Sequence, residues 1–320
     1  MVRWGVIGTG SIARVFAADL AFSDSGEVVA VGSRSRATAD RFADELGVAG
    51  RYDTYEALVA APEVDAVYVA TPHPMHHAHA CLAIDAGKAV LVEKPFTMNA
   101  DEALDLVRAA RARDVFLMEA MWTRFLPPVA QIRRLVANGT LGEIVSVHAD
   151  HGGWFPEDAG SRLFAPELGG GALLDLGVYA VSFASMVLGT PERIVALHDP
   201  AFTGVDAQTS MLFGHARGAQ AVLTCTLAAN GPTRAAIVGT AARIEIERPF
   251  YAPTAFTLIP RDGEAARSEW SYEGVGLHHQ ADEVARCLAE GLRESPLMPV
   301  DESVSVMATM DAVVAQAACR

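Results

Sequence analysis

Residues 3–13, RWGVIGTGSIA, determine the fold that we expect for the first part of the chain. An apolar run leads directly into the turn GTGSIA, residues 8–13, and a helical pattern of apolar residues follows. The turn fits the dinucleotide-binding pattern G-x-G-x-x-G/A, which carries weight only between a strand and a helix. Gly8 permits the tight turn, Gly10 lets the backbone approach a pyrophosphate, and the helix N-terminus offers it free N–H groups. The alternative is a tight turn that holds no ligand.

Apolar strand patterns alternate with helical patterns as far as residue 120. Further strands are expected over residues 28–34, 65–71, 89–93 and 115–120, and helices over residues 38–47, 76–87 and 99–114. Continuous apolar strands that alternate with helices are typical of a parallel sheet covered on both faces. The sequence therefore predicts a dinucleotide-binding Rossmann domain over residues 1–120.

After residue 120 the pattern changes to long strands separated by short turns. These strands are expected over residues 143–152, 193–199, 206–215, 219–229, 234–240 and 242–249. They predict an α+β domain over residues 121–320, with a large, mostly antiparallel open sheet, for substrate binding and dimerisation. The uncovered face of that sheet is the expected surface of a homodimer or higher homo-oligomer. The fold class of the whole chain is α/β.

The composition limits the classes of partner. Of the 320 residues, 51% are hydrophobic and 20% are charged, which is typical of a folded protein with two domains. The formal net charge of −14 argues against nucleic acid or an anionic membrane as a partner, because both attract clustered Lys and Arg. The sequence begins with a predicted strand and shows no signal-peptide pattern, so we expect a cytoplasmic protein. Its four cysteines lie far apart, so we expect them to be reduced thiols. The apolar run over residues 171–189 contains Asp175 and predicts a buried helix rather than a membrane span.

The end of the second strand bears on the choice of nucleotide. An NAD-specific fold places Asp or Glu about twenty residues after the glycine turn, to accept from the ribose 2′-hydroxyl. Here residues 32–36 read GSRSR, and no carboxylate follows before Asp40. Ser33 and Arg34 instead offer a hydroxyl and a guanidinium to a 2′-phosphate. We therefore predict NADP as the cofactor, with NAD as the second choice; the alternative is that Arg34 and Arg36 are solvated loop charges.

Two more segments place polar residues where a site is expected. Lys94 follows the strand over residues 89–93, at the carboxyl edge where ligands bind in this architecture, although a strand-end lysine can also be merely solvated. Asp175 and Tyr179 stand four residues apart and share one face of the apolar helix expected over residues 172–187. An acid on such a helix indicates either a structural hydrogen bond or a functional site.

Together these segments resemble the glucose–fructose oxidoreductase and inositol dehydrogenase (Gfo/Idh/MocA) family. The motifs GTGSIA, TPHPMHHAHA, GKAVLVEKP and GGGALLDLGVY occur in the order and spacing of that family. The segments MEAMWTRFLPP and HGGWFPEDAGSRLFAPELGGGALLDLGVYAVSF are most similar to its dimeric dihydrodiol dehydrogenase and D-xylose dehydrogenase branch. The resemblance implies a dehydrogenase that uses a nicotinamide cofactor and acts on a hydroxyl of a sugar, such as a pentose aldose, or of a trans-dihydrodiol. It also implies a cis Lys94–Pro95 peptide.

The resemblance implies roles for individual residues. Lys94 would contact substrate and nicotinamide, and Tyr179, where many members carry histidine, would exchange the proton with help from the Lys94 charge. Asp175 corresponds to the aspartate of the family's helix and completes the catalytic set. The predicted cofactor-binding residues are Gly8, Thr9, Gly10, Ser11, Ile12, Ser33, Arg34, Thr71, Pro72, His73, His76, Glu93 and Lys94. The predicted substrate-binding residues are Trp122, Arg124 and Phe155, for which core packing is the alternative.

Two other functions fit the same residues. The first is an NADPH-dependent ketose or anhydrosugar reductase, or a sugar oxidoreductase that does not release its nucleotide. The second is a nucleotide-sensing regulator without activity, against which the joint presence of Lys94, Asp175 and Tyr179 argues. A metal is not predicted, because the histidines clustered over residues 73–79 lack an acidic partner from a further element.

Overall fold

The computed structural model describes residues 1–318 and divides the chain into two compact units. Unit 1 consists of Met1–Phe125 and Tyr272–Val304, and unit 2 consists of Leu126–Ser271 and the described residues from Ser305 onward. The first boundary lies close to the predicted one at residue 120. The segment Tyr272–Val304 differs from the prediction, because it clusters with unit 1 rather than with the second domain.

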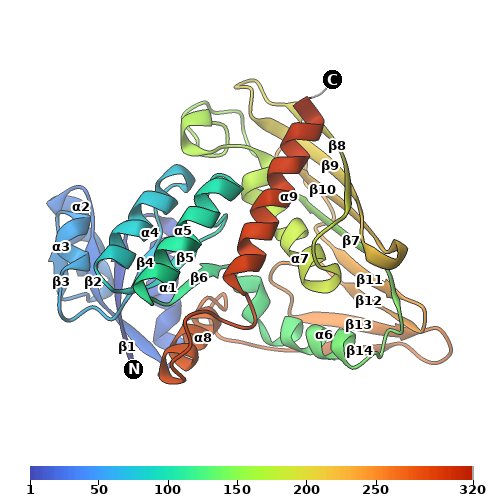
Figure 1. Ribbon diagram of the computed structural model, residues 1–320, viewed down its shortest axis with the longest axis horizontal. Coiled ribbons are helices and arrows are strands. Elements are labelled where there is room, and N and C mark those ends of the chain that lie inside the picture. Colours follow the sequence, from blue (N-terminus) through green and yellow to red (C-terminus); the bar gives the residue numbers. More distant parts are fainter. Residues whose placement is uncertain (319–320) are drawn as a thin grey trace. The chain divides into compact units, whose positions relative to one another are not determined.

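Unit 1 contains a six-stranded parallel sheet with the strand order β3-β2-β1-β4-β5-β6 (Figure 1). Its strands are β1 (Val2–Ile7), β2 (Gly26–Gly32), β3 (Gly50–Tyr52), β4 (Ala66–Val69), β5 (Ala89–Glu93) and β6 (Leu117–Ala120). Every residue of β4 and β5 is buried, as a parallel sheet covered on both faces requires. The strand order reverses between β1 and β4, so their carboxyl ends mark the edge where ligands bind in this architecture. The predicted Rossmann fold is confirmed.

Most helices of unit 1 lie between these strands in the chain, whereas η3 (Trp122–Phe125) and α8 (His278–Ala289) follow β6. Those between the strands are α1 (Ser11–Asp19), η1 (Leu20–Phe22), α2 (Arg36–Leu46), α3 (Tyr55–Val59), η2 (His73–Met75), α4 (His76–Asp85) and α5 (Ala100–Arg113). Helix α5 shows why they form where they do. The Asn99 side chain accepts from the Glu102 backbone N–H at 2.9 Å, and Arg111 and Arg113 lie in the last turn, where the helix dipole favours cations.

The buried carboxylate of Asp19 ties the returning segment to unit 1. It accepts hydrogen bonds from the backbone N–H groups of Val275 at 2.9 Å and Leu277 at 2.6 Å, just before α8 begins. Helix α9 (Val300–Ala318) starts in this segment and continues into unit 2.

Unit 2 contains an eight-stranded sheet with the order β14-β13-β12-β11-β7-β10-β9-β8. Its strands are β7 (Ile144–Gly152), β8 (Arg193–Pro200), β9 (Asp206–Gly214), β10 (Gln220–Thr226), β11 (Ala235–Gly239), β12 (Ala242–Ile246), β13 (Ala255–Pro260) and β14 (Ala266–Glu269). All neighbours are antiparallel except β7 and β10, which confirms the prediction of a mostly antiparallel sheet.

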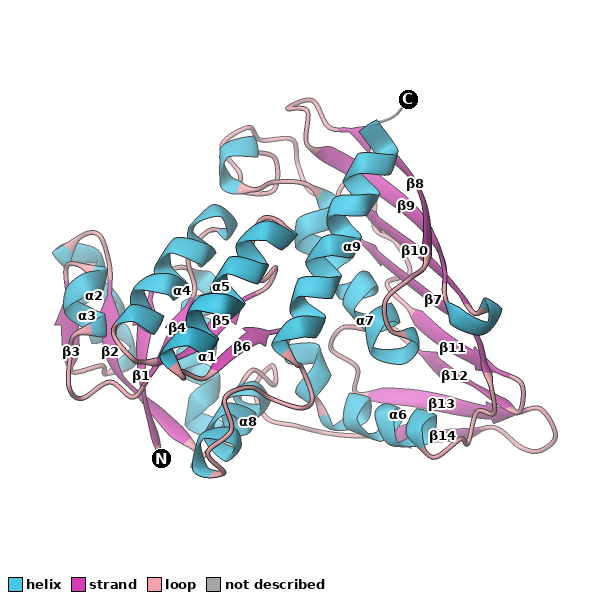
Figure 2. Cartoon of the chain, in the orientation of Figure 1, coloured by secondary structure: helices cyan, strands magenta, loops and turns pink. Residues whose placement is uncertain are grey.

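Of the remaining elements of unit 2, α6 (Pro127–Ala137) precedes these strands in the chain and the others lie between them. Those between the strands are η4 (Pro166–Leu168), the π-helical turn η5 (Leu173–Gly177), α7 (Val178–Leu188) and η6 (Ala216–Gly218). Helix α7 packs against β7 and β10 (Figure 2). The stretch Pro166–Leu188 has the length and apolarity of a membrane span, but most of it is buried inside the protein. It therefore forms part of the core, as the sequence predicted.

Candidate active site

The glycine turn connects β1 to α1, and its geometry suits a bound pyrophosphate. Gly8 has φ +107°, and a Cβ there would lie 2.6 Å from the Ala70 carbonyl oxygen, so only glycine fits. A Cβ on Gly10 would meet nothing within 4 Å. Gly10 caps α1 without a side-chain hydrogen bond, which leaves the first N–H groups of the helix facing this open space. The turn therefore fits the phosphates of a dinucleotide.

The hydroxyl of Ser33 is already engaged within its own loop. Ser33 is buried after β2, and its Oγ lies 2.5 Å from Oγ1 of Thr38. Because Thr38 Oγ1 donates to the Ser35 carbonyl at 2.9 Å, the Ser33 hydroxyl is the donor in this contact. A 2′-phosphate beside Ser33 would have to compete with Thr38 for that proton.

Arg34 is exposed and lies near two aromatic rings that the sequence reasoning missed. Burial raises the pKa of Tyr55 and lowers the pKa of His79, and the charge of Arg34 lowers both. The two rings meet edge to face at 4.6 Å. Arg36, by contrast, pairs with Asp40 at 2.9 Å. Among residues 1–318, Arg34 forms no ion pair, so its guanidinium remains available to an anion.

His76 joins the two loops that carry the predicted cofactor contacts. Its buried ring places Nε2 2.9 Å from the Thr71 carbonyl oxygen and Nδ1 2.8 Å from the Pro95 carbonyl oxygen. Burial lowers the pKa of His76 to about 4, so at neutral pH the ring is uncharged and donates through one nitrogen at a time. His73 is also buried and packs edge to face on this ring at 5.7 Å. This arrangement suggests that His76 positions the loops.

Glu93 holds the backbone at the end of β5. Its buried carboxylate accepts from the Tyr68 hydroxyl and from the Lys94 backbone N–H, the latter at 3.2 Å. The Lys94–Pro95 peptide is cis, which confirms the prediction. Lys94 itself is half-buried at the carboxyl end of the parallel sheet. Glu93 thus fixes the position of the Lys94 backbone through this hydrogen bond.

In unit 2, Asp175 forms an ion pair that the sequence reasoning did not identify. Its nearly buried carboxylate accepts from two nitrogens of the Arg162 guanidinium, at 2.9 and 3.3 Å. Asp175 lies in η5, and π-helical turns of this kind occur frequently at functional sites. The partner explains how an acid is tolerated in this apolar helix.

Tyr179 is buried in the first turn of α7 and belongs to a cluster of rings. Its ring centroid lies 5.5 Å from that of His151 and 5.1 Å from that of Tyr251. His151 and Tyr251 stack on each other at 4.5 Å, and His151 Nδ1 lies 3.3 Å from the Leu176 carbonyl oxygen. His151 and Tyr251 were not predicted. Alternate residues of a strand point to the same face, so the position of His151 four residues after the buried Val147 on β7 could have identified the histidine.

The predicted substrate-binding residues lie in both units. Trp122 and Arg124 belong to η3 of unit 1, and both are buried. The Arg124 guanidinium pairs with Glu302 of α9 at 2.7 Å, which the sequence did not predict. Phe155 is half-buried in unit 2, where its backbone N–H donates to the Leu227 carbonyl at 3.0 Å. Lys94 and Tyr179 likewise belong to different units, and their pairing stays a prediction.

Comparisons with known proteins give consistent results. The model of the oxidoreductase family with an NAD-binding Rossmann fold matches residues 2–121, and that of the GFO/IDH/MocA C-terminal domain matches residues 129–245. The chain is 36% identical over 311 residues to trans-1,2-dihydrobenzene-1,2-diol dehydrogenase of Mus musculus, covering 94% of this chain and 92% of the relative.

Solved structures share the whole architecture. A 3-ketoreductase from Actinomadura kijaniata, in complex with NADP and TDP-benzene, is 29% identical with a TM-score of 0.86, covering 99% of this chain and 98% of that one. The aldose-aldose oxidoreductase from Caulobacter crescentus, complexed with glycerol, has a TM-score of 0.90 at 23% identity, covering 99% and 97%. At that identity the second likeness supports the fold alone.

Proposed function

Because the chain belongs to the GFO/IDH/MocA oxidoreductase family, we propose that it is an NADP-dependent dehydrogenase of sugars or trans-dihydrodiols. The observation that carries the proposal is the unobstructed N-terminus of α1 at the same sheet edge as Lys94. The first feature suits the phosphates of the nucleotide, and the second places an ammonium where the reacting end of the nucleotide is expected. The names of the curated relatives support the dihydrodiol side of the substrate range.

In this proposal the residues of the chain hold the nucleotide and move a proton. Gly8 and Gly10 let the backbone and the N–H groups of α1 approach the pyrophosphate. The nicotinamide, when bound, exchanges the hydride. Tyr179 takes the hydroxyl proton of the substrate during oxidation, and Lys94, fixed through Glu93, supplies the positive charge that favours the phenolate. Trp122 and Phe155 offer aromatic faces to the C–H faces of the substrate.

A turnover screen tests the proposed activity. Pentoses, hexoses and trans-dihydrodiols are offered with NADP and with NAD, and the reduced nicotinamide is followed by its absorbance. We expect oxidation of at least one of these classes. Turnover only of ketoses or anhydrosugars with NADPH would favour the reductase, which would use the same site to catalyse the reaction in the direction of reduction. Nucleotide binding without turnover of any of these compounds would favour the nucleotide-sensing regulator.

The choice of NADP over NAD is proposed to depend on Arg34. Arg34→Ala is expected to weaken NADP binding by about 10–100-fold, because it removes a charge-assisted hydrogen bond to the 2′-phosphate. NAD has no such phosphate, so its affinity should change little. Calorimetric titration of both nucleotides measures the two effects, and Arg36→Ala is the matched control, because Arg36 already pairs with Asp40. Equal losses for both nucleotides would mean that Arg34 only stacks on adenine, and wild-type preference for NAD would overturn the assignment.

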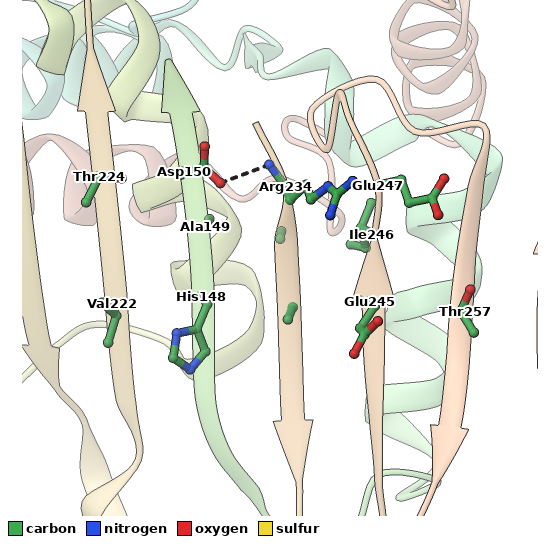
Figure 3. Close-up of a pocket in the computed structure, with 12 residues that line it drawn as sticks. His148, Ala149, Asp150, Val222, Thr224, Arg234, Glu245, Ile246, Glu247 and Thr257 are labelled. Carbon is green, nitrogen blue, oxygen red and sulfur yellow. Dashed lines mark hydrogen bonds between the residues drawn. The ribbon is translucent and has the colours of Figure 1, made fainter. Parts of the chain in front are cut away.

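The open face of the sheet in unit 2 is proposed as the surface of a homodimer. Val195, Leu212 and Val222 lie in register across β8, β9 and β10, and their exposed fractions are 56%, 45% and 42%. A second copy would remove this apolar row from water. A hollow of about 450 Å³ continues the face, with His148 and Glu245 among the side chains that line it (Figure 3).

The oligomeric state of one variant tests this surface. Leu212→Lys is expected to shift the protein from dimer to monomer in light scattering, because it places a charge in the apolar row. Val275→Lys is the control, since Val275 is an equally exposed apolar residue of unit 1, at 46%. A dimer that persists in Leu212→Lys, or a wild-type monomer, would contradict the proposed surface.

A further inference from the structure

Three side chains from two helices converge on the surface of unit 1, outside the residues assigned to nucleotide or substrate. His77 and Cys81 belong to α4, and Asp105 belongs to α5. His77 Nε2 lies 2.8 Å from Asp105 Oδ2 and 3.7 Å from Cys81 Sγ. The three candidate ligand atoms all lie within 4.8 Å of one another. An imidazole, a thiol and a carboxylate therefore meet at one point.

The fold explains why these residues meet. His77 and Cys81 stand four residues apart, so they occupy one face of α4 on successive turns. Helices α4 and α5 lie side by side over the parallel sheet (Figure 2), and this brings Asp105 to that face. The sequence pattern did not predict a metal, because the histidine cluster had no acidic partner from a further element. Asp105 is such a partner, contributed by a helix that follows in the chain.

We propose that His77, Cys81 and Asp105 bind a zinc ion. A tetrahedral zinc site has nitrogen–sulfur and nitrogen–oxygen ligand separations of about 3.5 Å and about 3.4 Å. The nitrogen–sulfur separation of 3.7 Å in this structure is close to the first value. The nitrogen–oxygen separation of 2.8 Å is that of a hydrogen bond and has to lengthen, which a rotation of the exposed Asp105 side chain can provide. Three protein ligands leave the fourth position of the ion to water.

The chemistry and the exposure of the three groups fit this ion. Zinc accepts neutral imidazole, thiolate and carboxylate ligands, and a thiolate with a carboxylate balances its two positive charges. Cys81 would bind as the thiolate and release its proton to solvent. The His77 and Asp105 side chains are 28% and 66% exposed, so the ion can enter directly from water. Bound zinc would replace the hydrogen bond between His77 and Asp105 and cross-link the two helices.

Zinc titration of the full chain, without a histidine tag and in a buffer that does not bind metal, tests the site. Wild-type protein is expected to bind one zinc ion that depends on all three residues. Changes outside the ligand set of a metal site already cost about 10–100-fold in affinity, so Cys81→Ser and His77→Ala should each cost more than 100-fold. Asp105→Asn should weaken binding by at least about tenfold, whereas the control Asp101→Asn, on the exposed first turn of α5, should leave it unchanged.

Cobalt reports directly on the sulfur ligand. Co²⁺ bound at this site should show thiolate-to-metal charge-transfer absorption in the near ultraviolet, and Cys81→Ser should abolish it. Circular dichroism of each metal-free variant establishes that it is folded. Zinc binding that survives Cys81→Ser would overturn the proposal and direct attention to the second candidate cluster, His278, His279 and Asp282. Absence of zinc binding to the wild-type protein would overturn it as well and leave the three residues as a surface hydrogen-bonded group.

Discussion

Tyr179→Phe is expected to lower turnover by about 10²–10⁴-fold, the usual contribution of a positioned proton donor or acceptor. The substitution removes one hydroxyl and keeps the aromatic ring. Because the Tyr179 ring is buried against His151 and Tyr251, the packing of α7 should be preserved. The nucleotide is proposed to bind through unit 1, so its affinity should also change little. A selective loss of turnover would therefore identify the hydroxyl as a catalytic group.

Steady-state kinetics in both directions, with thermal unfolding as the test of folding, measure this effect. Tyr52→Phe is the control, because it removes a tyrosine hydroxyl from the edge strand β3, where that hydroxyl donates to Glu63. In the wild type the oxidation rate should rise with pH as the proton acceptor ionises, and the variant should lose this dependence. If the variant keeps near wild-type turnover and an unchanged pH profile, Tyr179 is only part of a pocket wall. Lys94 or Asp175 would then have to carry the proton.

The sequence predicted those parts of the fold that depend on local patterns. The glycine turn requires a backbone conformation at Gly8 that other residues rarely adopt, and the apolar runs of β4 and β5 fit only a covered sheet. The return of the segment Tyr272–Val304 to unit 1 could not be predicted from such local patterns. The Asp19 carboxylate accepts hydrogen bonds from the backbone of Val275 and Leu277, which follow it in the sequence by 256 and 258 residues. No local periodicity predicts hydrogen bonds between residues so far apart.

In the candidate site, too, local spacing was predictable from the sequence, whereas contacts between distant residues were not. The spacing of Asp175 and Tyr179 placed both on one helix face, but their partners Arg162 and Tyr251 come from loops with no regular pattern. The position of Tyr251 depends on the turn that follows β12, far from Tyr179 in the sequence. Such contacts follow from strand register and turn geometry, which the sequence alone does not specify.

Lys94→Ala is expected to lower turnover as severely as Tyr179→Phe, because the phenolate loses the neighbouring charge that favours it. The local fold should persist, since Glu93 holds residue 94 through its backbone N–H, which alanine retains. Lys88→Ala is the matched control. Lys88 precedes β5, at the opposite end of the strand, and its ammonium donates to the Ala61 and Val64 carbonyls, so its loss should affect stability rather than turnover.

The double variant of Lys94 and Tyr179 distinguishes a joint role from two separate ones. Catalytic groups that act as a unit are strongly non-additive, so the double variant should be little slower than either single variant. Turnover numbers of the wild type, both single variants and the double variant complete the cycle. Losses that multiply would mean that the two residues contribute independently. A small effect of Lys94→Ala alone would remove Lys94 from the proton-transfer step and leave Tyr179 to depend on another group. The His151 imidazole, with its ring centroid 5.5 Å from that of Tyr179, would then be the candidate in the ring cluster, because histidine exchanges protons near neutral pH.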